Sequence, residues 1–70
     1  MRYKWTRITE PEFERLVRLC NFTPVELQIF KLRRKGLAPG FVADEIGYSK
    51  RQMERISREA ILKIMQCSQN

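Results

Sequence analysis

Two similar helix-start signals, T-E-P-E at residues 9–12 and T-P-V-E at residues 23–26, most constrain what this chain can fold into. In each signal, threonine can cap the first turn, proline suits a position whose N–H has no helical partner, and glutamate can complete a capping box. Gly36 and Gly47 can adopt the left-handed conformation that ends a helix. Starts and stops at this spacing predict several short helices and no sheet.

The first two predicted helices differ in their apolar faces. The first ends near Asn21 and carries a single stripe at i, i+3, i+4 and i+7: Phe13, Leu16, Val17 and Cys20. The second, residues 24–35, carries apolar residues on two sides. One side holds Val25, Ile29 and Leu32, and the other holds Leu27 and Phe30. A helix that is apolar on two sides is expected to lie in the centre of the domain.

Two further helices are predicted after Gly36. Pro39 allows a short helix that Gly47 ends, and the residues on its buried side are expected to be Phe41, Val42 and Ile46. Ser49 can cap a last helix that runs to about Cys67. Its apolar face is predicted to consist of Met53, Ile56, Ala60 and Ile64, with Ser57 and Ile61 at the border.

The chain is therefore predicted to be a small all-α domain of four helices, at residues 9–67, followed by a tail at residues 68–70. Residues 1–8 form a basic, aromatic arm before it. The arm could enter a minor groove of DNA. We favour the alternative in which Tyr3 or Trp5 folds back and enlarges a small core.

The composition argues against catalysis, a zinc site and a membrane span. The chain contains no histidine, the commonest acid–base group at neutral pH and a usual zinc ligand. Its two cysteines, Cys20 and Cys67, are interpreted as reduced thiols that pack as small hydrophobic residues. No apolar run approaches the roughly 18 residues that cross a bilayer, and the first residues lack the apolar region of a signal peptide. We expect a cytoplasmic protein without enzymatic activity, cofactor or metal.

Charge points to a polyanionic partner. Lysine and arginine total 14 against 8 acidic residues, which gives a net charge of +6. The cations gather in K-L-R-R-K at residues 31–35 and again along residues 49–63. Such a balance favours nucleic acids through phosphate neutralisation and counterion release.

Residues 39–58 have the pattern of a helix-turn-helix. Ala43 is small where a second helix would cross the first, and Gly47 suits a turn that needs positive φ. The apolar residues that could hold the two helices together are Val42, Ile46, Met53 and Ile56. The alternative is a corner of two helices that has no role in DNA binding.

From about Thr9 to Met65 the chain resembles region 4 of bacterial sigma factors and the related LuxR-type DNA-binding domains. The matching stretches are TPVELQIFKLRRKG, FVADEIGYS and KRQMERISREAILKIM. A-P-G before Phe41 departs from the polar cap that these families usually carry there. The resemblance implies a transcriptional regulator that binds a specific sequence of duplex DNA through a recognition helix at about residues 50–66. RNA polymerase and a second copy of the chain are candidate partners.

The residues expected to meet DNA lie on that helix. Arg51, Arg55 and Arg58 fall in one sector opposite the apolar face, at about 100° per residue. The early positions of such a helix usually meet bases. Arginine can pair with guanine and glutamine with adenine, so the predicted base readers are Arg51, Gln52 and Arg55. The predicted phosphate-binding or supporting residues are Ser49, Lys50, Glu54 and Arg58. Glu54 could accept from cytosine or orient a neighbouring arginine. A solvated basic face without a reading role is the alternative.

Two further groups of residues carry open interpretations. Arg33, Arg34 and Lys35 could clamp a DNA phosphate, or they could be a solvated face. Leu62 and Met65 lie on the outward side of the last helix, where they could form a partner surface or a dimer contact, or be covered by the arm. They support a second hypothesis for function, a protein-binding module of the same fold that docks on RNA polymerase or a regulator without reading DNA.

Overall fold

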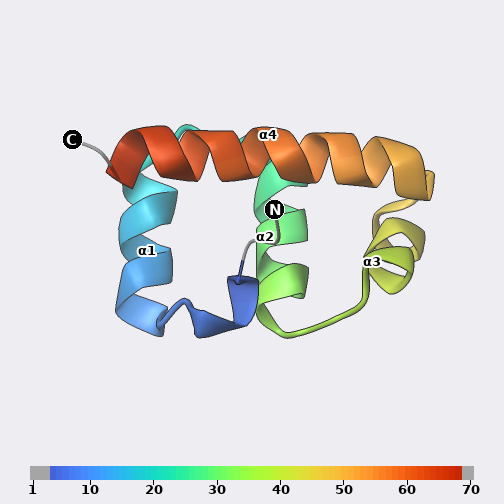
Figure 1. Cartoon of the computed structure of the whole chain (residues 1–70), viewed down its shortest axis with the longest axis horizontal. Coiled ribbons are helices and arrows are strands. Elements are labelled where there is room, and N and C mark those ends of the chain that lie inside the picture. The colour runs from blue at the N-terminus through green and yellow to red at the C-terminus, as the bar shows by residue number, and fades with distance from the viewer. Residues whose placement is uncertain (1–3, 69–70) are drawn as a thin grey trace.

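The computed structural model describes residues 4–68, which form a short 3-10 turn and four α-helices. These elements are η1 (Trp5–Arg7), α1 (Glu10–Leu19), α2 (Pro24–Arg34), α3 (Pro39–Ile46) and α4 (Lys50–Ser68). Within that part of the chain there is no strand, so the prediction of an all-α domain with four helices is confirmed. Figure 1 shows α1, α2 and α3 below the long α4, which contacts all three.

Side chains cap the first two long helices at the predicted residues. Thr9 Oγ1 accepts a hydrogen bond from the backbone N–H of Glu12 at 3.4 Å. At α2 the bonds are reciprocal, because Thr23 Oγ1 accepts from Glu26 N at 3.2 Å and Glu26 Oε1 accepts from Thr23 N at 2.9 Å. The second threonine therefore forms the complete capping box that its sequence predicts.

The two predicted glycine stops are also present. Gly36 follows α2 with φ 90°, and Gly47 follows α3 with φ 76°, both in the region that side chains with a Cβ rarely adopt. α1 ends slightly before Asn21, with Cys20 as its C-cap. None of the helices in the described residues is long and apolar enough to cross a bilayer.

The core consists of two clusters that share α2. The first contains Trp5, Ile8, Leu16, Cys20, Phe30, Ala60 and Ile64. The second contains Ile29, Val42, Ala43 and Met53. The neighbours Ile29 and Phe30 thus lie in different clusters, and neither is exposed to solvent. This arrangement confirms that α2 is buried on two sides and lies centrally.

Aromatic packing around Phe30 ties the N-terminal segment to the core. The rings of Trp5, Phe13 and Phe22 each meet the Phe30 ring edge to face, with centroids 5.4, 4.9 and 5.5 Å away. Trp5 is only 4% exposed. The favoured prediction, that an aromatic residue of the arm enlarges the core, is confirmed for Trp5, whereas Tyr3 lies outside the described residues.

The prediction that Phe41 belongs to the core is wrong. Phe41 was expected on the buried side of α3, but 53% of it is exposed. Val42 and Ala43 are buried and Ile46 is half-buried. At about 100° per residue these three share one face, and Phe41 lies about 100° beyond its edge. A helix as short as α3 packs only this one face against α2 and α4.

Candidate nucleic-acid interface

The end of α3 and the start of α4 are held in a fixed relationship by a short turn. The turn consists of Gly47, Tyr48 and Ser49, and the backbone N–H of Tyr48 donates to Ala43 O at 3.0 Å. In the first turn of α4, Met53 is 1% exposed and belongs to the same apolar cluster as Ala43 of α3. The orientation of α4 against α3 is therefore set by both backbone hydrogen bonds and side-chain packing.

Ser49 and Gln52 form a second reciprocal cap, at the start of α4. Ser49 Oγ accepts from Gln52 N at 3.2 Å, and Gln52 Oε1 accepts from Ser49 N at 3.3 Å and from the Ser49 hydroxyl at 3.1 Å. The predicted cap at Ser49 is confirmed, but the part played by Gln52 was missed. The spacing S-x-x-Q is itself a capping-box signal and could have revealed it. Since glutamine pairs with adenine through both its oxygen and its nitrogen, this cap competes with base reading.

The three arginines of the predicted sector point away from the core. Arg51, Arg55 and Arg58 are all exposed, while Met53 and Ala60 on the opposite face are buried. The ion pairs found within residues 4–68 involve Arg34 and Lys63, so in that part of the chain these arginines have no carboxylate partner. It follows that Glu54, which is also exposed, does not orient Arg51 or Arg58 through an ion pair. The first turns of α4 therefore present arginines that are not paired with a carboxylate of the described residues.

Arg34 binds the N-terminal segment, an interaction that neither of its two predicted roles, a phosphate clamp or a solvated face, includes. Its Nε donates to Ile8 O at 3.0 Å, and its Nη1 lies 2.8 Å from Glu10 Oε1. The guanidinium carbon also lies 5.0 Å from the centroid of the Phe13 ring. These partners are distant in sequence, so no local signal could have identified them. Arg34 is held by the fold and is not a free cation.

The two neighbours of Arg34 in the predicted clamp differ from it. Arg33 is half-buried and its Nη1 donates to Leu37 O at 2.8 Å, at the end of α2. Lys35 is exposed and is the C-cap of α2. The three cations therefore differ in their environments, and Lys35 is the exposed one.

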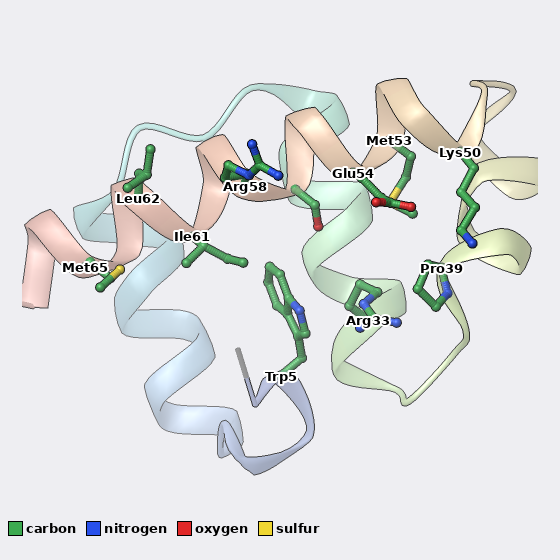
Figure 2. A pocket seen from close by; sticks show the side chains of 11 residues that line it. Trp5, Arg33, Pro39, Lys50, Met53, Glu54, Arg58, Ile61, Leu62 and Met65 are labelled. Atoms are coloured by element: carbon green, nitrogen blue, oxygen red, sulfur yellow. The ribbon is translucent and has the colours of Figure 1, made fainter. Parts of the chain in front are cut away.

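A groove of about 880 Å³ runs along one side of α4 (Figure 2). Its lining residues come from η1, α2, α3 and α4: Trp5, Arg33, Pro39, Lys50, Met53, Glu54, Ser57, Arg58, Ile61, Leu62 and Met65. The predicted partner residues Leu62 and Met65 lie at one end of it, 53% and 39% exposed. Sequence patterns place these two residues on an outward side of α4, but they do not show the opposite wall, which comes from distant segments.

Comparisons with known proteins returned no relatives for this chain. No protein-family model matches it. No curated protein and no solved structure gives a significant match. The resemblance to sigma factor region 4 therefore depends on the motifs in the sequence alone.

Proposed function

We propose that this protein is a transcriptional regulator that binds a specific sequence of duplex DNA with α4 in the major groove. The observation that carries the proposal is the exposure of Arg51 and Arg55 on the first turns of a helix whose opposite face is buried. The resemblance to region 4 of sigma factors and the net charge of +6 support it independently. The regulator would act by occupancy, blocking or recruiting RNA polymerase at its site.

In this proposal Arg51 and Arg55 read bases. Each guanidinium can donate two parallel hydrogen bonds to O6 and N7 of guanine. Gln52 would have to release Ser49 before it could pair with adenine, which costs the cap of α4. We therefore assign sequence reading to the two arginines, while Gln52 positions the start of the helix.

Phosphate contacts would hold α4 in the groove. Lys50 and Arg58 are exposed on α4, and Lys35 is exposed at the end of α2. The start of α3 offers a further contact, because Ala38 provides no side-chain cap for the first-turn N–H groups. Such contacts contribute affinity that falls steeply with salt but carry no sequence information.

The test compares two arginine variants of equal charge change. Arg55→Ala should weaken binding to a duplex enriched from a random pool by about 1–3 kcal/mol and leave binding to an unrelated duplex nearly unchanged. Arg15→Ala, on the exposed side of α1, is the control and should change neither affinity appreciably. An equal loss on both duplexes would make Arg55 a phosphate contact, and no loss on either would remove it from the interface.

A protein-binding module of the same fold is the second candidate function. The specific observation in its favour is the exposure of Leu62 and Met65 beside a groove. A module that docks on RNA polymerase or a regulator without reading DNA would show no sequence preference on duplex DNA, whatever its affinity at low salt. Sequence preference therefore separates the two candidates.

A further inference from the structure

The groove along α4 exposes a continuous stripe of that helix. Several of the α4 residues that line the groove follow one another at intervals of three or four positions: Lys50, Glu54, Arg58, Leu62 and Met65. Repeats at this spacing lie on one side of a helix. The opposite wall is formed by Trp5, Arg33 and Pro39, as Figure 2 shows. The stripe is therefore one wall of a groove and not an isolated convex surface.

The two ends of the groove differ in chemistry. Near the start of α4, its walls carry two positive side chains, Arg33 and Lys50, and one negative side chain, Glu54; a third positive side chain, Arg58, lies in the middle of the groove. Arg33 uses one guanidinium nitrogen on Leu37 O and retains further donors. This end of the groove therefore favours a negatively charged occupant.

The other end is apolar. Ile61, Leu62 and Met65 line it, and the ring of Trp5 lies next to Ile61, which packs against the same core cluster (Figure 2). Large apolar side chains exposed together beside a groove are typical of sites for protein partners. A DNA backbone would use the cations but would leave this apolar end unfilled, so a protein segment fits the whole groove better.

We propose that the groove binds an acidic amphipathic helix of a partner protein. Between Lys50 and Met65, α4 rises by about 22 Å, at roughly 1.5 Å per residue, which is the length of a helix of about 15 residues. The bound helix places its acidic residues beside Lys50 and Arg58. Its apolar anchors, spaced at i, i+3, i+4 and i+7, lie against Leu62 and Met65. Lys50 and Arg58 also contact phosphates in the proposed DNA complex, so the bound helix and duplex DNA would compete for these two residues.

The test is a selection from a displayed library of helical peptides of about 15 residues, a length set by the helix rise. The full chain is used as bait, in parallel with two variants of matched exposure. Leu62→Ser changes the groove at a residue that is 53% exposed, and Leu19→Ser changes α1 outside it at a residue that is 55% exposed. Because both side chains are largely exposed, both variants should fold.

The expected result is enrichment of peptides with acidic residues at one end and apolar anchors at the other. Their affinity is measured through the fluorescence of Trp5, the only tryptophan, with peptides that contain none. Leu62→Ser should weaken binding about tenfold, as expected for truncation of an apolar anchor. Leu19→Ser should leave it within about twofold, which is ordinary for a surface change. Replacing the acidic residues of a selected peptide by lysine should abolish binding.

Three results would overturn the proposal. The first is a selection that enriches no acidic amphipathic pattern. The second is equal peptide affinity for the Leu62→Ser and Leu19→Ser variants, which would place the contact outside the groove. The third is a loss of duplex DNA affinity in Leu62→Ser as large as its loss of peptide affinity, which would assign the groove to DNA.

Discussion

The ammonium of Lys63 lies 2.6 Å from Glu26 Oε1 and joins the second half of α4 to the start of α2. Lys63 Nζ also donates to Asn21 O at 2.9 Å. Glu26 is 2% exposed, and the same carboxylate oxygen accepts from the backbone of Thr23. The capping box of α2 and the position of α4 are thus parts of one hydrogen-bonded network, which holds the longest helix in place.

This network makes stability depend on pH through Glu26. Burial alone would raise the pKa of its carboxyl group, but hydrogen bonds from Lys63 and Thr23 outweigh burial and lower the pKa below its ordinary value of 4.5. Because the pKa of Glu26 is lower in the folded than in the unfolded state, its ionised carboxylate stabilises the fold at any pH above the pKa of the unfolded state. This contribution is lost as the pH falls through the pKa of the folded state.

Glu26→Gln should therefore lower the free energy of unfolding at pH 7 by roughly 2 kcal/mol, as for a hydrogen bond to a charged group. Urea unfolding at neutral and acid pH measures the effect, and the difference from wild type should shrink as the pH falls below 4.5. Glu14→Gln, the same change at an exposed residue of α1, is the control and should have little effect. A difference that stays constant with pH would contradict the network.

A variant of Gly47 tests the turn before α4, and a variant of Gly40, within α3, is the comparison. Gly47 has φ 76°, so Gly47→Ala should destabilise the fold by about 1–2 kcal/mol, the cost of a left-handed residue with a Cβ. Gly40 lies within α3 and a Cβ there would meet nothing within 4 Å, so Gly40→Ala should stabilise by up to about 1 kcal/mol. Thermal unfolding of both variants checks the opposite signs. A neutral or stabilising effect of Gly47→Ala would refute this description of the turn.

The neighbouring cations Arg34 and Lys35 are expected to contribute differently to stability, because Arg34 is bound within the fold and Lys35 is exposed. Arg34→Ala should lower the free energy of unfolding by about 1–2 kcal/mol, because the bond to Ile8 O and the contact with Phe13 are lost. The ion pair itself adds little, since Glu10 is 65% exposed. Lys35→Ala removes the same charge at an exposed residue and should stay within about 0.5 kcal/mol. Equal effects in urea unfolding would mean that Arg34 is not a structural residue.

The cysteines should differ in reactivity. Burial, with a hydrogen bond to Cys67, raises the pKa of the Cys20 thiol to about 12, so little of the reactive thiolate is present near neutral pH. Cys20 should resist an alkylating reagent at about pH 8 in the folded protein and react once urea unfolds it. Half-buried Cys67 is the internal comparison and should be modified first. Mass spectrometry of peptides shows which of the two cysteines is alkylated first, and alkylation of Cys20 before Cys67 would contradict the burial of Cys20.

The sequence predicted best what depends on neighbouring residues. The caps at Thr23 and Ser49 and the left-handed stop at Gly47 each depend on a few adjacent positions, and all three are present. The capping role of Gln52 was not predicted, although its signal, the spacing S-x-x-Q, is equally local.

The sequence could not predict contacts that depend on how the helices pack. Lys63 and Glu26 are 37 residues apart, and Arg34 and Ile8 are 26 apart, so no periodic pattern connects either pair. The exposure of Phe41 follows from which face of α3 meets α2 and α4, which apolar spacing alone does not determine. The groove likewise needs Trp5 of the N-terminal segment beside α4.

The central claim is that α4 reads a DNA sequence with Arg51 and Arg55. Its most direct test is selection from a random duplex pool at roughly 0.15 M salt, where nonspecific binding is screened. Wild type and Arg15→Ala should enrich the same short site, and a variant with both Arg51→Ala and Arg55→Ala should enrich none. A palindromic site would indicate two copies of the chain, and a single half-site would indicate one. Failure of the wild type to enrich any sequence, or enrichment of the same site by the double variant, would contradict the claim.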